Sequence, residues 1–414
     1  MERLTIHASA TVRADDGAGV AARADAQATP VAAVRPGDTA GVVEVVRTAI
    51  DRRTRLRIVG RGTWLGAGRP VADAQPLLLD ALTGIVDYTP GDLTLTARAG
   101  TSLAEIAAVT LPNGQWLALA PWGGDVGSLG ATAATASAGP MSGALGTPRD
   151  VVIGLEVVTG TGDVVRGGGR VVKNVAGFDL TRLMVGAWGT LGVLTEISVR
   201  LRGLPERDIT VALALPPGNA RLVDLLGRLR TALIAPLALE LIDATLAARL
   251  QVGSEPALLT RLAGNDDSVA AQRDVLAGLG DVADVAGDVW SALREAEPSS
   301  ASVVRLSGPV GRLADAWSAA SRVAGSTTGA FAHASVLRSV TRVVVPNEDG
   351  TLPDGAVESL RALTPDVRIF ERLPATLWSS LASTAVADRL SRGVRSAFDP
   401  HLLLNPGILG EGTT

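Results

Sequence analysis

Residues 121–143 read PWGGDVGSLGATAATASAGPMSG, and two segments follow closely: RDVVIGLEVVTGTGDVVRGGG at 149–169 and VKNVAGFDLTRLMVGAWGTLGVLTEISVRL at 172–201. The first segment is almost entirely Gly, Ala, Ser and Thr, so it buries little apolar area of its own and must be packed by other parts of the chain. Such a composition fits either a flexible linker or backbone that closely approaches a ligand. Linkers are rarely followed at once by apolar strands such as 151–158 and 193–201, so we favour a ligand site.

A second glycine-rich stretch lies upstream, where the apolar strand 56–59 runs directly into GRGTWLGAG at 60–68. A glycine turn after a strand can aim consecutive backbone N–H groups into one concavity, which suits a pyrophosphate. The spacing is G-x-G-x-x-x-G rather than the dinucleotide fingerprint, and no clear amphipathic helix follows. Alone the loop is equally compatible with a plain turn; the small-residue segment downstream favours a ligand.

The composition of the whole chain restricts the function classes. Its 414 residues are enough for two or three domains, and the net charge of -4 with 38 dispersed basic residues argues against a nucleic-acid binder. No 18-residue apolar run is free of charges or turn signals, and the N-terminus lacks a signal-peptide core. We therefore expect no transmembrane segment and a soluble, cytoplasmic protein.

The residues available for chemistry are few. The chain has no cysteine, and its three histidines, His7, His333 and His401, are scattered. Disulfides, cysteine-ligated zinc, iron–sulfur clusters and thiol nucleophiles are thereby excluded for this chain, and we expect no metal site. The chemistry must belong to carboxylates, hydroxyls or a bound organic cofactor.

Residues 1–29 are unpatterned and are interpreted as a loose N-terminal arm. Beyond them, Ser102 and Glu105 form a capping box that we interpret as structural, and the turn at 160–162 predicts a hairpin. Up to residue 203 the expected strands are 56–59, 77–80, 92–99, 116–120, 151–159, 163–167 and 193–201. The expected helices are 40–53, 103–109 and the end of a loop over 173–183.

The ordered set of motifs resembles a known family. GRGTWLGAG, PWGGDVGSLGATAATASAGP, TPRDVVIGLEVV, VKNVAGFDLTRL, GAWGTLGVLTEI and the terminal FDPHLLLNPGIL stand in the order typical of the vanillyl-alcohol oxidase and p-cresol methylhydroxylase type of FAD flavoproteins. Within this family the chain is most similar to the FAD-binding E subunit of bacterial glycolate oxidases. The resemblance covers about residues 30–203 and the last twenty residues.

The resemblance implies an α+β fold: a two-subdomain FAD-binding domain of the p-cresol methylhydroxylase type at 30–203, an α+β cap domain at 204–390, and a C-terminal return to the FAD domain at 391–414. It also implies which residues hold FAD. The glycine loop would donate backbone N–H groups to the pyrophosphate, and the small-residue segment would follow the ribityl chain and isoalloxazine. Gly189 and Val193 would lie by the adenosine, and Asn405 would lie near the flavin ring. In order, the residues implied are Gly60, Arg61, Gly62, Thr63, Trp64 and Leu65; Gly127, Ser128, Gly130, Thr132, Thr135 and Gly139; and Gly189, Val193 and Asn405.

The chain also departs from the family's catalytic 2-hydroxy-acid subunits. Thr132 stands where those subunits usually have Asn, and Trp188 stands where they usually have Glu. Their histidine-rich motif in the cap is absent. The glycine loop has neither the His nor the Cys that anchors covalent flavins in the family, so non-covalent FAD is expected.

In the cap, the expected strands are 209–215, 237–242, 303–307 and 341–345, and the expected helices are 219–233, 268–279 and 310–323. The resemblance implies an antiparallel sheet flanked by helices and covering the flavin. His333 has apolar sequence neighbours, which favours a satisfied core or interface histidine over a catalytic base; His401 is a weaker candidate still. A cluster of Arg305, Arg338 and Arg342 could clamp a substrate carboxylate, but a solvated or interface charge is favoured for each. Leu402–Leu404 are expected to pack on the FAD domain. No catalytic residue is assigned.

Three functions remain open. The chain could be the FAD-binding subunit that oxidises a small 2-hydroxy acid such as glycolate, passing electrons to an iron–sulfur subunit because it has no cysteine of its own. It could be a non-catalytic FAD-binding structural subunit, or a stand-alone alcohol oxidase that uses O2. The resemblance implies a hetero-oligomer with a catalytic D-like flavin subunit and an F-like iron–sulfur subunit, with any membrane association at the inner face and only through these partners.

Overall fold

The computed structural model describes residues 32–169, 179–347, 350–363, 368–384, 386 and 388–411. A five-stranded antiparallel sheet forms the centre of the first domain, in the order β3-β4-β8-β6-β7. Its strands are β3 (Ile85–Thr89), β4 (Thr94–Arg98), β6 (Val152–Val158), β7 (Val164–Gly168) and β8 (Val193–Arg200). The predicted hairpin of β6 and β7 is confirmed, whereas β3 was not expected from the sequence. The expected N-terminal arm lies outside the described residues, as does most of the loop expected at 173–183; α7 (Leu180–Met184) forms at its end.

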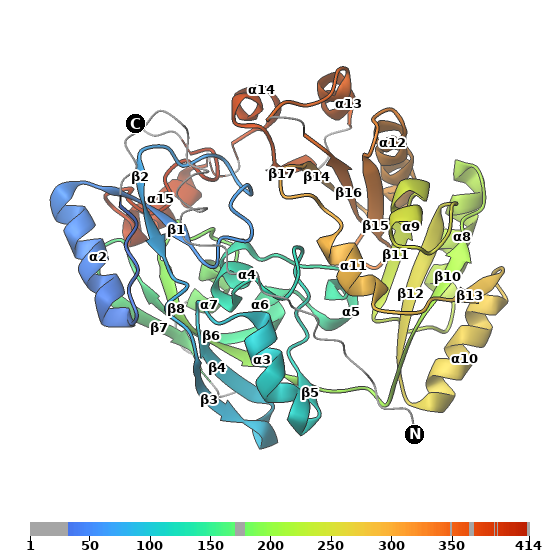
Figure 1. Cartoon of the computed structure of the whole chain (residues 1–414), viewed down its shortest axis with the longest axis horizontal. Coiled ribbons are helices and arrows are strands. Elements are labelled where there is room, and N and C mark those ends of the chain that lie inside the picture. The colour runs from blue at the N-terminus through green and yellow to red at the C-terminus, as the bar shows by residue number, and fades with distance from the viewer. Residues whose placement is uncertain are drawn as a thin grey trace.

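A small parallel sheet of β1 (Arg55–Val59) and β2 (Ala74–Leu78) lies against α2 (Thr39–Arg52), which presents its buried face to the same core. The C-terminal part of the chain returns to this sheet: α15 (Arg389–Phe398) lies beside it (Figure 1), and Leu404 bridges to Leu56. Leu403 and Leu404 are buried in the domain core as expected, but Leu402 is 36% exposed and the expectation for it is wrong. The turn at residue 402 is left-handed, which directs that side chain outward.

Short helices connect these sheets: α3 (Leu103–Thr110), α4 (Leu129–Thr135), α5 (Ser142–Leu145) and α6 (Pro148–Val151). The capping box at Ser102 is confirmed. The small-residue segment includes α4, which sequence periodicity did not reveal because alanine and glycine give it no apolar stripe. Close packing explains its composition, since a Cβ on Gly130 would lie 2.7 Å from both the Cβ and the carbonyl oxygen of Ala99. The strand expected at 116–120 is wrong: only β5 (Gln115–Trp116) pairs, with β9 (Arg202–Gly203).

The second domain, which we call the cap, is built on an eight-stranded antiparallel sheet in the order β13-β10-β12-β11-β15-β16-β14-β17. Its strands are β10 (Arg207–Ala214), β11 (Ala238–Ile242), β12 (Ala257–Gly264), β13 (Val282–Asp284), β14 (Ser302–Ser307), β15 (Phe331–Ser335), β16 (Val340–Val345) and β17 (Arg368–Arg372). The helices are α8 (Asn219–Thr231), α9 (Ala244–Arg249), α10 (Asp266–Ala277), α11 (Val289–Glu295), α12 (Leu313–Gly325), α13 (Ala356–Ala362) and α14 (Trp378–Leu381). The expected strands and helices of the cap are present, with β12, β13, β15 and β17 in addition.

The alternation of side chains along the cap strands gives the sheet two different faces. Leu239 and Leu241, Ala332 and Ala334, Val343 and Val345, and Val304 and Leu306 belong to the hydrophobic core formed with α8, α10 and α12. Because successive side chains of a strand point to opposite faces, the residues next to them along each strand point away from these helices, and four of these are charged or titratable. Those residues are Glu240, His333, Arg342 and Arg305, and they face the first domain.

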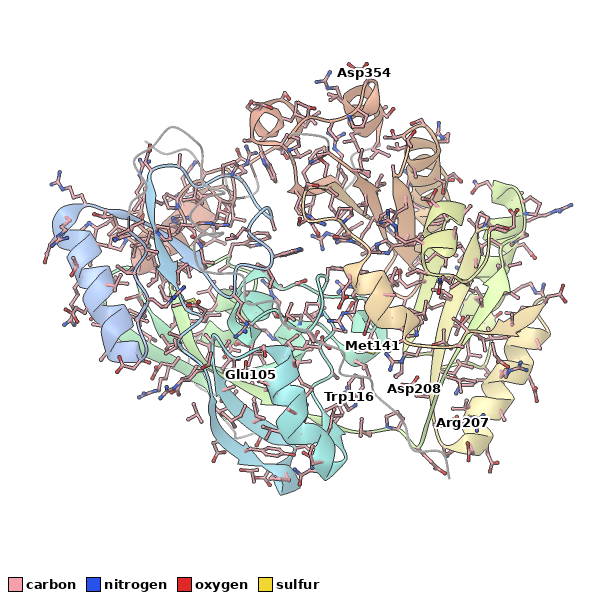
Figure 2. All side chains as sticks on the ribbon, viewed as in Figure 1. Glu105, Trp116, Met141, Arg207, Asp208 and Asp354 are labelled. Atoms are coloured by element: carbon pink, nitrogen blue, oxygen red, sulfur yellow. The ribbon has the colours of Figure 1, made fainter. Side chains whose placement is uncertain are left out.

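The two domains lie side by side, with α4, α5 and α11 at the seam between them (Figure 1). Met141 and Asp208 lie next to this seam in Figure 2, and Arg261 on β12 joins them by pairing with Asp208 at 2.6 Å and reaching Met141 Sδ at 3.3 Å. Arg294, near the end of α11, makes a second set of contacts. Its side chain is 2.5 Å from Asp125 and donates to the carbonyl of Pro121 at 2.8 Å. These contacts hold the polar face of the cap toward the small-residue segment. Within the described residues, no helix has the length and apolar character needed to cross a membrane.

Candidate active site

The glycine loop and the small-residue segment meet at one cavity, which we call the FAD cavity. A Cβ on Gly60 would lie 2.4 Å from Ser128 Oγ, so the two segments are in direct contact despite their separation in sequence. All but two of the predicted cofactor-binding residues line this cavity: Gly60, Arg61, Gly62, Thr63, Trp64, Leu65, Gly127, Ser128, Gly130, Thr132, Thr135, Gly189 and Asn405. The central expectation, that both glycine-rich segments line one crevice, is met by this geometry.

The remaining two residues lie elsewhere. Gly139 lines the neighbouring cavity between the domains, where a Cβ would come within 1.9 Å of the carbonyl oxygen of Ala120. Val193 lines neither cavity and is fully buried in the core of the first domain, whereas Gly192 and Leu194 beside it line the FAD cavity. Residue 193 therefore packs the sheet, and its two neighbours contribute to the wall.

The glycine loop offers a row of free donors. The backbone N–H groups of residues 61–65 donate to none of the residues that the structure describes, although these residues line a cavity. Residues 61–65 are exposed or half-buried, so a ligand that enters the cavity can reach their N–H groups. A diphosphate has the charge and the number of oxygens that such a row of donors can bind. This donor set fits the pyrophosphate of FAD.

Asn405 fastens three segments around the FAD cavity. Its side-chain oxygen accepts from the N–H of Ile58 at 2.8 Å, and its side-chain amide donates to the carbonyl of Trp188 at 2.7 Å. Its own N–H donates to Leu56 at 2.9 Å, and its φ of 43° lies in the left-handed region that Asn tolerates better than most residues. The residue therefore joins β1, the loop at 188 and the C-terminal return in one contact.

Aromatic residues form the junction between the FAD cavity and a larger one. Trp64 and Trp188 stack with ring centroids 6.2 Å apart and planes inclined by 22°. Trp188 has a φ of 55°, which is unusual for a bulky side chain and is held by the carbonyl contact to Asn405. Trp64, Trp122 and Trp188, with Thr135, Ser137 and Ile408, line both cavities, so the two spaces are continuous.

The larger cavity, here the interdomain cavity, has a volume of about 1000 Å³ and lies between the first domain and the polar face of the cap sheet. Its cap wall is set by strand register: His333 on β15 pairs with Arg342 on β16, and Arg342 pairs with Arg305 on β14. Glu240 on β11 pairs with Ser335 on β15 in the adjacent row. The side chains on this wall are Glu240, Arg305, His333, Ser335, Arg338, Arg342 and Glu371.

A buried ionic network backs this wall. Arg342 is 2.8 Å from Glu297 and 2.7 Å from Glu371, and Arg372 is 2.5 Å from Glu297. Burial alone would raise the pKa of Glu297, but Arg342 and Arg372 outweigh it and lower that pKa to about 2. Arg305 is 3.4 Å from Glu371 at the edge of the network. Glu297 is therefore charged throughout the physiological range and holds the two arginines in place.

The interpretation of His333 as a core or interface histidine agrees with its burial and its contact with Glu240. The side chain is buried, but its surroundings are charged: Nδ1 is 3.3 Å from Glu240 Oε2, and Nε2 is 4.0 Å from Glu297. Burial would lower the pKa of His333, but the carboxylates of Glu240 and Glu297 outweigh burial and raise it. The apolar neighbours in FAHAS face the helices, which the strand alternation of that segment could have indicated. His401 lies at a separate surface hollow near the C-terminal return.

The three arginines that the sequence singled out all line the interdomain cavity. Arg342 is not solvated but buried in the network, Arg305 is half-buried, and Arg338 donates to Ser142 Oγ at 3.3 Å across the seam. Burial first, and then the charge of Arg305, lowers the pKa of Arg338. Arg69, Arg149 and Arg368 also line the cavity, so its cations outnumber its carboxylates. No group of three or more metal-ligating side chains occurs within the ranges that the structure describes.

Comparison with known proteins agrees with this geometry. Residues 30–168 match the model of the FAD binding domain family. The chain is 36% identical over 255 residues to glycolate oxidase subunit GlcE of Escherichia coli, covering 61% of this chain and 67% of that protein. The chain belongs to the family of FAD-binding oxidoreductases that includes the glycolate oxidase subunit GlcE.

Further proteins are similar over different lengths, and the solved structures among them show the fold. Glycolate oxidase subunit GlcD of Bacillus subtilis is 32% identical over 218 residues, which is 52% of this chain and 46% of that protein. Among solved structures, p-cresol methylhydroxylase superposes with a TM-score of 0.72 at 16% identity, covering 91% of this chain and 88% of the other. The 6-hydroxy-D-nicotine oxidase of Arthrobacter nicotinovorans superposes with a TM-score of 0.66 at 17% identity, with 97% of each chain covered. The predicted α+β fold and the FAD cofactor are confirmed.

Proposed function

We propose that this chain is the FAD-binding subunit of a complex that oxidises a small 2-hydroxy acid such as glycolate. The observation that carries the proposal is the junction of the two cavities: an arginine-rich wall faces the space that opens from the FAD cavity through Trp64, Trp122 and Trp188. A carboxylate would compensate that excess of positive charge. The similarity to GlcE and GlcD points to the same class of acid.

FAD binds non-covalently in this proposal. Residues 61–65 would donate their N–H groups to the pyrophosphate, the segment around Ser128 and Thr135 would hold the ribityl chain and isoalloxazine, and Gly189 and Asn405 would complete the wall. Support for a non-covalent cofactor comes from the sequence, which has no cysteine and no histidine in either glycine-rich segment. The bound flavin supplies the redox chemistry by accepting a hydride equivalent from the substrate carbon.

The residues of this chain bind and orient the acid. Arg305 and Arg338 are the cations best placed for its carboxylate, because burial and then the charge of Arg305 lower the pKa of Arg338, and a bound anion offsets both effects. Arg342 is already neutralised by Glu297 and Glu371 and acts instead as a fixed part of the wall. Enclosure between the two domains excludes water and strengthens these electrostatic contacts.

Electrons then leave through a partner. A chain without cysteine cannot ligate an iron–sulfur cluster through thiolates, so we propose an F-like iron–sulfur subunit and a D-like flavin subunit, with any membrane contact at the inner face through them. One observation supports the alternative of a non-catalytic FAD subunit. In the ionic network behind the cavity wall, Glu297 and Glu371 already neutralise much of the arginine charge that would bind a substrate carboxylate. A stand-alone oxidase would release peroxide without partners.

The test is an anaerobic absorbance measurement on the FAD-loaded chain, with glycolate and then with longer 2-hydroxy acids. Reduction of the flavin supports the proposal; flavin that stays oxidised with every acid overturns it in favour of the non-catalytic subunit. Arg338→Gln should raise the acid concentration for half-maximal reduction at least tenfold, because a charged hydrogen bond to a carboxylate contributes about 1.5–3 kcal/mol. The matched control is Arg322→Gln on α12, which lies outside both cavities and should change nothing.

A further inference from the structure

One carboxylate on the cap wall has an unused oxygen. Oε1 of Glu240 is buried and has no hydrogen-bond partner among the described residues, although the side chain lines the interdomain cavity. Glu240 is 1% exposed, and Ser335 lies opposite it in register, adding a hydroxyl to the same patch. A buried carboxylate oxygen without a donor is costly, so it indicates a ligand that brings a hydrogen to it.

The other oxygen of Glu240 is fixed. His333 Nδ1 lies 3.3 Å from Oε2, and the imidazole packs against Trp122 with ring centroids 4.8 Å apart and planes inclined by 54°. Trp122 is in turn covered by the Arg342 guanidinium, 4.7 Å from the ring centroid. The position of Oε1 is therefore set by a chain of packed groups that ends on the wall of the FAD cavity.

The other carboxylates near Glu240 and His333 are engaged by groups of the fold. Glu297 is engaged by Arg342 and Arg372, and Asp243 accepts the N–H groups of Leu246 and Ala332 at 2.9 Å and 2.7 Å. Both of these carboxylates are thus occupied within the fold. Glu371, the other carboxylate on the cavity wall, is paired with Arg342 at 2.7 Å and with Arg305 at 3.4 Å. Glu240 Oε1 has no such cation and no hydrogen-bond partner among the described residues.

We propose that Glu240 accepts the proton of the substrate hydroxyl and that His333 is its positioning residue. This inference rests on the proposed oxidation of a 2-hydroxy acid. The hydroxyl O–H bond breaks and its proton passes to Glu240 Oε1; the C2–H bond breaks with its electron pair, and the hydride equivalent goes to the bound flavin. The substrate becomes the 2-oxo acid, so two electrons and two hydrogens leave it and are accounted for.

The electrostatics fit this role. Burial raises the pKa of Glu240 and is only partly opposed by His333, the Ser335 hydroxyl and the charge of Arg342, so its carboxylate is a stronger base than an exposed one. Activity must then rise with pH through the raised pKa of Glu240, because only the ionised carboxylate accepts a proton. Removing His333 removes the compensating partner and should raise that pKa further.

The experiment measures the rate of anaerobic flavin reduction against pH in the FAD-loaded chain, with the acid that reduces the wild type best. Glu240→Gln keeps the shape but cannot accept the proton, so the rate should fall at least a hundredfold and its dependence on pH in this range should disappear. His333→Gln should retain a measurable rate, with the rising limb moved to higher pH. His401→Gln, at the surface hollow near the C-terminus, is the matched control and should keep both rate and profile.

Folding is checked separately by the flavin absorbance spectrum and the thermal midpoint, and Glu240→Asp, which keeps a carboxylate, should recover part of the rate lost in Glu240→Gln. If Glu240→Gln is reduced within threefold of the wild-type rate with an unchanged pH profile, the inference alone is wrong. If Glu240→Asp is as slow as Glu240→Gln while both bind FAD normally, Glu240 is structural and the inference is also wrong. If no acid reduces the wild type, the proposed function and the inference fail together.

Discussion

Replacing Asn405 by alanine tests whether the FAD cavity is held together as described. The substitution removes two side-chain hydrogen bonds, one from the Ile58 N–H and one to the Trp188 carbonyl, and leaves both part-buried groups without this partner. Each orphaned group costs about 1–3 kcal/mol, so the domain should lose about 2–6 kcal/mol of stability. Alanine also fits the left-handed backbone at this position less well than asparagine, which adds to the loss.

The assay is thermal unfolding of the chain without added FAD, together with FAD affinity from titration of flavin fluorescence. At about 2–4 °C per kcal/mol for a unit of 150–250 residues, Asn405→Ala should lower the midpoint of the first domain by at least about 4 °C. FAD affinity should fall as well, because Trp188 and Gly189 are no longer anchored beside the cavity. The matched control is Asn113→Ala, an exposed asparagine with one long bond of 3.4 Å to Val109, which should shift the midpoint by no more than about 1 °C.

One result would refute the role of Asn405 in joining the three segments. A midpoint within about 1 °C of wild type, with FAD affinity within twofold, would mean that the three segments are held together without this side chain. A lower midpoint with unchanged FAD affinity would mean that Asn405 supports the fold but not the cofactor site. Only a loss of both agrees with the geometry.

Three further outcomes are expected. Gly139→Ala places a Cβ 1.9 Å from a carbonyl oxygen and should cost about 1–3 kcal/mol in urea unfolding, whereas Gly91→Ala, which meets open space, should be neutral; equal midpoints would contradict this. The pKa of Glu297 is lowered to about 2, so its carboxylate stabilises the folded chain fully above its ordinary pKa of about 4.5, and this stabilisation is lost as the pH falls from about 4.5 through about 2. The difference in unfolding midpoint between wild type and Glu297→Gln should therefore narrow over that pH interval. A difference that stays constant would count against the network. Adding FAD should quench tryptophan fluorescence less in Trp188→Phe than in wild type. In Trp317→Phe, which changes a tryptophan buried in the cap core, FAD should quench as much fluorescence as in wild type. Equal quenching in Trp188→Phe and wild type would place the flavin elsewhere.

Local sequence determined the elements whose signal is carried by a few neighbouring residues. The capping box at Ser102, the amphipathic helix α2 and the turn between β6 and β7 depend on chemistry within four residues, and all three are present. Short strands such as β3 and β17 were not found, because a five-residue apolar run does not distinguish a strand from a loop without its partners.

The motif order was enough to indicate the family, the FAD cofactor and the two glycine-rich walls, because phosphate binding by backbone requires small residues at fixed places in the chain. The segments that form the two walls of the FAD cavity are far apart in the sequence. Their contact could therefore be expected from the sequence, but the residues that make the contact could not be identified. Val193 illustrates the limit: the motif placed it at the cofactor, but the face of β8 on which its side chain lies buries it in the core.

The chemistry of the cap was decided only by tertiary structure. Glu240, His333, Arg342 and Arg305 come from four separate strands, and nothing in their own segments fixes which strand pairs with which. Register alone brings these side chains to one face, and burial there sets their pKa values and leaves one carboxylate oxygen free. A sequence specifies which groups are available, whereas their protonation and their partners depend on distances and solvent exclusion that exist only once the strands have paired.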